Sequence, residues 1–349
     1  MSFDVSRLAE PISESFPMGE DVRTGRHVEL YYRLKDARSA ARADERNFNL
    51  SEPFRMSSAW TDVRALSIEI LSTVSKDLEV LAWLCEAELR LTGFEGLARG
   101  FELTAQLVRR DFDALHSIDG DGTRDKVAPF AGLNGIRGEG ALVQPVRLAS
   151  LVAGGAFFRH SLFDFQMTQR PDGAERLKVL QEAVGEAGSA AMREHLGHVK
   201  RCSTAFADLT AAFDGACGPE APPASHIRTV LEQVRLAIVN LTGLREEDVP
   251  AASAVVGTVS AEAGTGAATV PAAASGPVRS REEALDRLME VARYFRDAEP
   301  HSPMASAIET LVARARLDFT ELLAELIEDD NQRRAVLIMA GIKPESGSS

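Results

Sequence analysis

Apolar residues recur at three- and four-residue intervals along much of the first 240 positions, and this spacing predicts a series of amphipathic helices. The first helix is expected over 28–46, and the second begins at Trp60 behind two serine caps. A third starts at Leu78 and is expected to end before Gly93, since a left-handed glycine often closes the last helical turn. A fourth follows over 96–115. The stripe of the third helix consists of Leu78, Leu81, Ala82, Leu84, Cys85 and Leu89.

The pattern weakens over 126–165, where many glycines interrupt it, and returns over 174–215 and 224–242 as long helices. No stretch keeps an alternating apolar and polar pattern between turn dipeptides, so strand signals are scarce. The sequence therefore predicts an all-α fold.

The sharpest change in composition lies at 246–279, where Ala, Gly, Ser, Thr, Val and Pro replace most large side chains. Such a segment buries too little apolar surface to offset its ordering entropy, and we interpret it as a flexible linker whose ends average about 30 Å apart. It divides an N-terminal helical domain at 1–130 and a middle helical region at 131–245 from a C-terminal unit at 280–349. The pattern leaves open whether the middle region forms a separate domain.

The C-terminal unit has the pattern of a small helical bundle. Ser280 and Glu283 match a capping box, two prolines separate the first helix from the second, and Asp318 with Glu321 opens a third. About 60 residues form only a marginal core, so we expect this unit to self-associate. The residues expected to divide between the intrachain core and subunit contacts are Phe295, Leu311, Phe319 and Leu323.

The formal charge of −13 argues against nonspecific binding to nucleic acid or to anionic membranes. Cys85, Cys202 and Cys217 are far apart and odd in number, which favours a reducing cytoplasm over a disulfide framework. The first residues lack the basic and apolar regions of a secretory signal. No segment has the roughly 18 uncharged apolar residues of a membrane span.

One helix face could present His195, His198 and Cys202, which lie at i, i+3 and i+7. These residue types are zinc ligands, so the spacing is that of half a zinc site. A second ligand cluster and an H-E-x-x-H motif are both missing from the sequence. The competing interpretation, which we favour, is two surface histidines and a core cysteine with no metal.

Two further segments resemble ligand loops. Residues 119–130 begin like a calcium loop, but Arg124 and Phe130 replace the required glycine and glutamate. We expect a turn and a helix start there, with Arg124 paired to nearby aspartates. The glycines of 132–140 lack a phosphate-binding motif. Cys85 lies within an apolar helix and is expected to be an inert thiol. We therefore expect neither catalysis nor a cofactor.

Charged residues also mark the start of the third helix and the segment near the N-terminus. Lys76 and Asp77 precede the helix, where they can cap it, pair with a neighbouring helix or face a partner. Asp21 and Arg23 occur in an extended segment, and we interpret them as a short anchor that ties it to the helices.

Several of these segments occur in the order of a known family. The segments, in chain order, are "PMGEDVR", "YYRLKDARSAARADER", Trp60 with Val63, "SKDLEVLAWLCEAELRLTGFEGL", "DFDALHSIDGDGTR" and "SREEALDRLMEVARYFRDAEPHSPM". Together they resemble the TssA proteins of bacterial type VI secretion, also called the ImpA N-terminal family, in their short form. The resemblance covers about 17–130 and 280–342, with a similar linker between them. The chain departs from the family pattern at Gly25, Phe112 and Ser117. These departures affect the expected contacts with partners at those positions and not the resemblance itself.

The resemblance implies a non-catalytic, cytoplasmic and multimeric assembly protein that is recruited to the membrane-docked secretion apparatus. Its C-terminal region would build a ring-like homo-oligomer, and its N-terminal region would reach other components. Such proteins associate with the baseplate and prime polymerisation of tube and sheath. The family motifs include Asp21, Arg23, Lys76, Asp77 and Arg124, which the resemblance marks as structural or partner contacts. The alternatives are a helical adaptor outside secretion and a metal-dependent enzyme built on His195, His198 and Cys202.

Overall fold

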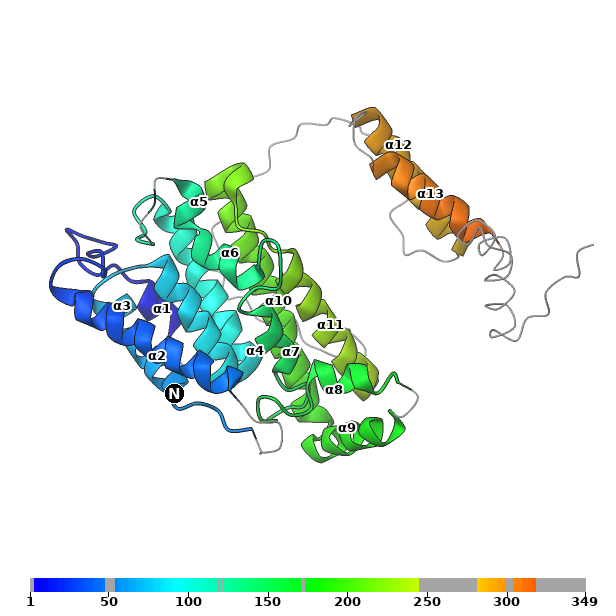
Figure 1. The fold of residues 1–349 in the computed structure, drawn as a ribbon, viewed down its shortest axis with the longest axis horizontal. Coiled ribbons are helices and arrows are strands. Elements are labelled where there is room, and N and C mark those ends of the chain that lie inside the picture. The colour runs from blue at the N-terminus through cyan, green and yellow to red at the C-terminus, as the bar shows by residue number, and fades with distance from the viewer. Residues whose placement is uncertain are drawn as a thin grey trace, which may run out of the picture. The chain divides into compact units, whose positions relative to one another are not determined.

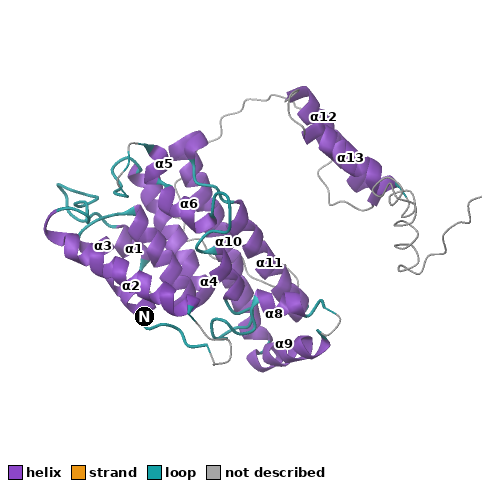
Figure 2. Cartoon of the chain, in the orientation of Figure 1, coloured by secondary structure: helices purple, strands orange, loops and turns teal. Residues whose placement is uncertain are grey.

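A computed structural model describes residues 3–47, 54–118, 120, 122–170, 173–244, 281–298 and 304–317 of the chain. The chain divides into two compact units, unit 1 at 1–257 and unit 2 at 258–349. The described residues form helices, turns and three isolated bridges, with no strand among them (Figure 2). The prediction of an all-α fold is confirmed.

Unit 1 contains eleven α-helices and two short 3-10 helices within its described ranges. The α-helices are α1 (Val5–Ala9), α2 (Val28–Arg46), α3 (Ala59–Thr73), α4 (Leu78–Asp111), α5 (Thr123–Lys126), α6 (Ala128–Asn134), α7 (Val143–Leu148), α8 (Leu162–Met167), α9 (Ala174–Ala187), α10 (Ser189–Cys217) and α11 (Ser225–Thr242). The 3-10 helices are η1 (Gly25–His27) and η2 (Gly218–Glu220).

Helix α4 is the centre of unit 1. It packs against α3 on one side and α10 on the other, while α2 covers α3 and α11 covers α10 (Figure 1). Most of its side chains are buried, including four charged ones, Glu86, Glu88, Arg90 and Arg99. A single apolar cluster extends from Phe3 to Ile238, so the segments predicted as the N-terminal domain and the middle region share one core. The boundary predicted at 130 stays a prediction.

The sequence predicted a helix end at Gly93, and the structure modifies this. Gly93 has a positive φ of 67°, but its ψ of −148° lies outside the left-handed helical region. The glycine therefore kinks the helix, and α4 continues from Phe94 to Asp111. The predicted long helix over 174–215 is similarly divided, because Gly188 takes a φ of 81° between α9 and α10.

The less regular segment at 126–165 forms short helices joined by a loop. Ser161 begins α8 with a capping box, since it accepts from the Asp164 N–H and the Asp164 carboxylate accepts from Ser161. Phe158 and His160, just before it, have positive φ values of 71° and 53°. Bulky residues rarely adopt this conformation, so the surrounding hydrogen bonds must hold the loop.

Unit 2 is described as a helical pair, α12 (Arg281–Ala298) and α13 (Met304–Arg316). An ion pair of 3.0 Å joins Arg316 and Asp286, and a second joins Arg296 and Glu309. The buried apolar residues of the pair are Leu285, Ala292, Ala305 and Val312. The predicted linker, the Ser280 cap and the predicted third helix lie outside the described residues. None of the helices in the described ranges is long and apolar enough to cross a membrane.

Candidate functional site

The start of α4 is the point where four charged or polar side chains converge. Asp77 is fully buried and caps the helix, accepting from the N–H groups of Glu79 at 2.9 Å and Val80 at 3.0 Å. Arg23 donates to both Asp77 oxygens, at 2.6 and 3.1 Å, and to Glu79 at 2.8 Å. Tyr31 donates to the same Glu79 oxygen at 3.0 Å. The extended segment before α2 is thus tied to α4 by a fork of charge-assisted hydrogen bonds.

This cluster perturbs the proton affinities of its members. Burial by itself would lower the pKa of Arg23, but its hydrogen bonds and charge attraction with Asp77 and Glu79 outweigh burial and raise that pKa. Burial and the neighbouring Glu79 carboxylate raise the pKa of Tyr31 to about 12. Arg23 therefore remains charged and Tyr31 remains a donor at neutral pH. Asp21 adds a 3.2 Å contact to Arg23.

Lys76 lies next to this cluster and binds backbone carbonyls instead of charged side chains. Its ammonium donates to the backbone carbonyls of Leu8 at 2.6 Å and Leu71 at 2.5 Å, near the ends of α1 and α3. The side chain is 1% exposed, and burial, together with the nearby positive charge of Arg110, lowers its pKa to about 8. Lys76 thus joins two helix ends whose carbonyls would otherwise lack partners.

The lowered pKa of Lys76 predicts a pH effect. Between about pH 8 and 10.5 the folded lysine is neutral while the unfolded one still binds a proton, so this group makes unfolding less favourable as pH rises. The neutral amine keeps two N–H groups and can still serve both carbonyls. We therefore expect the stability difference between wild type and Lys76→Met to grow in favour of wild type over this range. Urea unfolding at several pH values measures it.

The comparison with a variant is necessary because buried thiols change the stability of the protein with pH in the opposite direction to Lys76. Burial raises the pKa of Cys85 and of Cys202, so the unfolded state releases thiol protons first and stability falls above about pH 9. That contribution is common to both proteins and cancels in the difference. A difference that stays constant or shrinks above pH 8 contradicts the assignment to Lys76.

A layer of ion pairs continues along the buried face of α4, and its residues were not among the predicted site residues. Glu86 and Glu88 are fully buried; Glu86 pairs with Arg38, and Glu88 pairs with Arg64 at 2.5 Å. Arg90 binds Glu45 through two hydrogen bonds of 2.6 and 2.9 Å. The available signal was three charges at every second position, Glu86, Glu88 and Arg90, within the otherwise apolar run of 80–91.

The three residues of the predicted zinc half-site separate in the structure. Cys202 is buried in the core, whereas His195 and His198 line a groove beside the kink in α4. His195 Nε2 is 3.1 Å from the Ser150 carbonyl, its ring meets Phe94 edge-on, and burial lowers its pKa. Across the described ranges, no three His, Cys, Asp or Glu side chains are grouped to hold a metal ion.

Arg124 is an exposed residue of α5, the short helix that follows the calcium-like turn. Asp119 and Asp121, two of the aspartates near it, lie outside the described residues, so its expected pairing stays a prediction. The turn is held instead by Ser117, which donates to the Lys126 carbonyl at 2.7 Å, and by Lys126, which donates to the Asp113 carbonyl at 2.7 Å.

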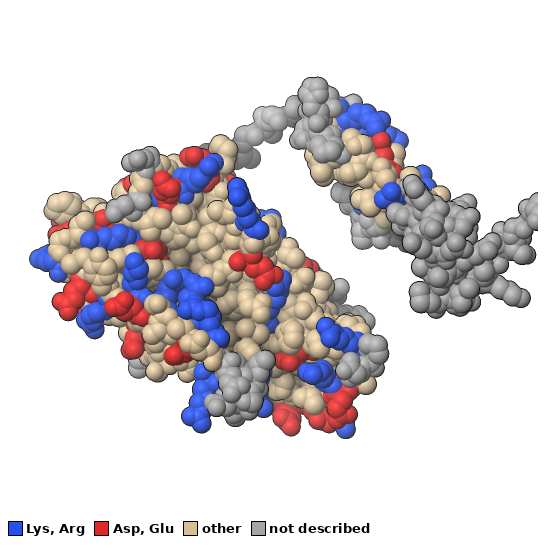
Figure 3. Space-filling view, in the orientation of Figure 1, with Lys and Arg blue, Asp and Glu red and all other residues tan. Residues whose placement is uncertain are grey.

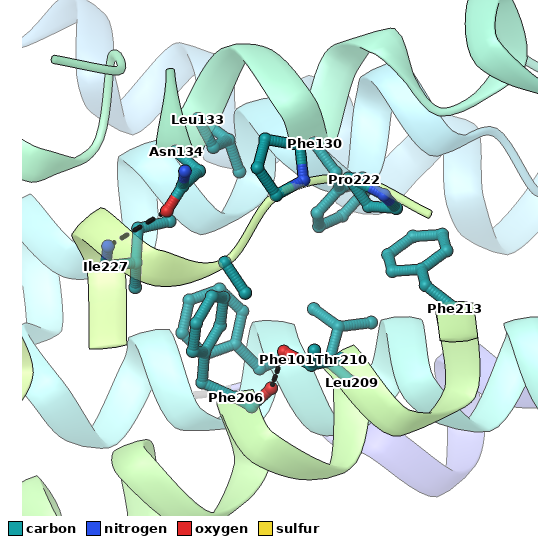
Figure 4. Close-up of a pocket in the computed structure, with 12 residues that line it drawn as sticks. Phe101, Phe130, Leu133, Asn134, Phe206, Leu209, Thr210, Phe213, Pro222 and Ile227 are labelled. Atoms are coloured by element: carbon teal, nitrogen blue, oxygen red, sulfur yellow. Dashed lines mark hydrogen bonds between the residues drawn. The ribbon is translucent and has the colours of Figure 1, made fainter. Parts of the chain in front are cut away.

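A small apolar cavity of about 20 Å³ lies where α4, α6, α10 and α11 meet (Figure 4). Four aromatic rings contribute to its walls, those of Phe101, Phe130, Phe206 and Phe213. Asn134 at its edge accepts from the Ile227 N–H at 3.0 Å and so fixes the start of α11. This volume accommodates about one water molecule, so the cavity is a packing feature and not a ligand site.

In unit 2, the structure describes two of the four predicted self-association residues. Leu311 is 64% exposed, and Phe295 is partly buried. Phe319 and Leu323 lie outside the described residues. The other exposed apolar residues of the helical pair are Leu288, Val291, Tyr294 and Met304.

Comparison with known proteins gives this arrangement a family. Residues 9–135 match the model of the ImpA N-terminal family, described as "ImpA, N-terminal, type VI secretion system". The chain is also 25% identical, over 339 residues, to the type VI secretion system component TssA1 of Pseudomonas aeruginosa, covering 93% of this chain and 95% of that protein. Residues 9–135 thus match the ImpA N-terminal family of type VI secretion, and the chain as a whole is similar to a TssA component.

The match to the family model spans α2, α3 and α4, and so includes the Arg23–Asp77 cluster and the buried glutamates. A solved N-terminal domain of the TssA component from Burkholderia cenocepacia, which includes the ImpA N-terminal region, shares the fold with a TM-score of 0.50. It is 23% identical and covers 70% of this chain and 95% of that domain. The ion-pair layer therefore lies within the part of the chain that matches the ImpA N-terminal family.

Proposed function

We propose that this protein is a non-catalytic assembly component of the type VI secretion system that works as a homo-oligomer. Unit 2 would gather copies of the chain into a ring, and unit 1 would extend from it as an arm that meets other components. In this role it would act in the cytoplasm at the membrane-docked apparatus, associate with the baseplate and prime polymerisation of tube and sheath. The match to the ImpA N-terminal family and the similarity to TssA1 support a role in type VI secretion. The exposed apolar residues of unit 2 support the oligomer.

The exposed apolar face of the helical pair is the observation that carries the proposal. Tyr294 is 65% exposed and Leu311 is 64% exposed, although both lie on helices with a buried apolar side. The described helical pair buries little apolar surface, and a unit of this size gains stability when such a face is covered. A second copy of the same pair offers a matching apolar face, as in other isologous contacts.

A charge introduced on this face is expected to reduce the number of copies in the oligomer. Leu311→Glu should lower the mass of the particle in solution, because an isolated carboxylate in an apolar interface must be desolvated without a partner. Multi-angle light scattering after size exclusion measures the mass. Leu236→Glu is the matched control, since Leu236 is 50% exposed on α11 of unit 1 and should leave the mass unchanged.

The complementary test removes unit 2. A chain truncated at 280 should stay folded but have fewer copies per particle than the full chain. A full-length protein that is monomeric at cellular concentration contradicts the ring, and so does a truncated chain with the same number of copies. Loss of effector secretion on deletion of unit 2 is the expected result in cells.

A further inference from the structure

An open groove of about 590 Å³ lies along the kink in α4. Arg90, which belongs to the ion-pair layer, is one of its lining residues. Four pieces of the chain form its walls: the segment before α3, the kink at 89–95, the loop at 149–157 and one side of α10. Its apolar lining residues include Phe54, Met56, Phe94 and Phe157. Pockets of this size bind small ligands or anchoring side chains of a peptide.

Arg90 connects the groove to three arginines of α2, and we name these four residues the arginine cluster: Arg38, Arg42, Arg46 and Arg90. Arg90 is the link, since it lines the groove and its guanidinium lies 4.1 Å above the Trp60 ring and 5.9 Å from the Phe157 ring. In Figure 3, Lys and Arg side chains lie over the α2 side of unit 1 with Asp and Glu side chains among them, and the whole chain is acidic.

Positive charge exceeds negative charge within this cluster. Two carboxylates, Glu45 and Glu86, face the four guanidinium groups, and Arg90 already occupies Glu45. Arg42 is 3.9 Å from the nearest Glu86 oxygen, beyond hydrogen-bond distance. Burial and the nearby charges of Arg38, Arg90 and Arg46 lower the pKa of Arg42, with partial compensation by Glu86.

The remaining acids near this site already have partners. Asp44, at the same end of α2, accepts from the Ser57 hydroxyl at 2.5 Å. Glu95 is the acidic residue among those that line the groove, and Arg99 holds it in an ion pair. On the opposite wall, His195 and His198 supply polar rings and no negative charge. The charge and the aromatic lining therefore complement a ligand that is acidic and carries a large apolar group.

We propose that this groove docks an acidic segment of a partner protein. One aromatic side chain of that segment packs against the touching rings of Phe54 and Phe157, and its carboxylates face Arg42 and Arg46. Arginine and aromatic residues are the usual anchors of such interfaces, and an aromatic side chain buried in a pocket supplies most of the binding energy. The inference rests on the proposed role of unit 1 as the arm that meets other components. It names the surface and the chemistry of that contact.

Fluorescence anisotropy with a designed probe tests the proposal on the full-length protein. The probe is a fluorescein-labelled nonapeptide of Glu and Asp with one central tryptophan. Two comparison peptides replace the tryptophan with glycine or every acid with lysine. We expect the probe to bind at least about tenfold more tightly than either comparison peptide. Its affinity should fall as salt rises, because exposed charge attraction is screened.

Matched variants locate the binding. Ala156 is exposed on the loop that forms one wall, so Ala156→Glu adds a carboxylate at the groove without disturbing the core. Ala114 is also exposed, about 25 Å farther along the α4 axis, and Ala114→Glu is the control. We expect the first change to weaken the probe by about tenfold or more and the second by less than about twofold.

The docking proposal would be overturned by no probe binding at about 1 mM, by equal binding of the comparison peptides, or by equal effects of the two variants. Preference for the lysine peptide would indicate a basic partner and also overturn it. Light scattering on the same samples keeps the proposals separate. A normal oligomer without probe binding rejects the groove alone, whereas a monomer that binds the probe rejects the ring alone.

Discussion

Replacing Asp77 with alanine is expected to destabilise unit 1 by about 4 kcal/mol, the largest effect of any single change to the α4 cluster. The substitution removes the cap of the longest helix in the described part of unit 1 and leaves the Arg23 guanidinium, 9% exposed, without its buried partner. Glu79 and Asp21 still contact Arg23, but both are more exposed than Asp77. A buried charge that loses its most buried partner is costly because it can neither lose its proton nor regain its water. Urea unfolding of the full-length protein, followed by far-ultraviolet circular dichroism, measures the change.

Two comparisons separate the cap from the ion pair. Asp4 caps α1 in the same way, accepting from the Ser6 N–H at 2.9 Å, but it is exposed and has no buried arginine. Asp4→Ala should therefore cost only about 1 kcal/mol. In a double-mutant cycle, Arg23→Met combined with Asp77→Ala should cost less than the sum of the single changes by at least about 1 kcal/mol. Strict additivity would show that the two side chains act independently.

Replacing Gly19 with alanine is expected to release the N-terminal segment from α4 and destabilise unit 1 by about 3 kcal/mol. Gly19 has a φ of +75°, and an added Cβ would lie 2.0 Å from the Val74 carbonyl oxygen. Backbone cannot move aside as a flexible side chain can. The chains must separate, and the hydrogen bonds from Glu20 N–H to Val74 and from Lys76 N–H to Met18 are then lost. Hydrogen exchange over 10–24 should accelerate.

Gly25 provides the control for backbone strain alone. Its φ of +71° is nearly the same, but no atom lies within 4 Å of the position of an added Cβ. Gly25→Ala should therefore cost only about 1 kcal/mol and leave exchange over 10–18 unchanged. Equal effects of the two substitutions would mean that close contact with Val74 does not hold the segment.

Local patterns predicted much of the helical structure. The helix expected over 28–46 is α2 with the same bounds, because its apolar stripe is short and uninterrupted. Errors arose at glycines. At Gly93 the apolar face of α4 continues beyond the kink, and packing on both sides keeps the two halves in one element. The apolar pattern of one segment does not show which helices will pack against it. The packing of α3 and α10 against α4 therefore decided that the helix continues beyond Gly93.

The site was less accessible to sequence reasoning. Asp21, Arg23 and Asp77 were identified as charged residues at segment ends, and the structure brings them together over 54 positions of sequence. Their partners Tyr31 and Glu79 were not identified, because nothing local indicates which tyrosine or glutamate faces them. His195 and His198 share a helix face as their spacing indicates, but the side chains that complete the groove come from three other segments.

The packing of α4 against α10 also has a consequence for synthesis on the ribosome. The face of α4 that receives α10 is complete when residue 111 has been made, but its cover ends at residue 217. About a hundred further residues must emerge before this apolar surface leaves water, which at bacterial rates takes several seconds or more. During that interval the nascent chain exposes the apolar face of a long helix to water. We therefore expect ribosome-associated chaperones to bind it.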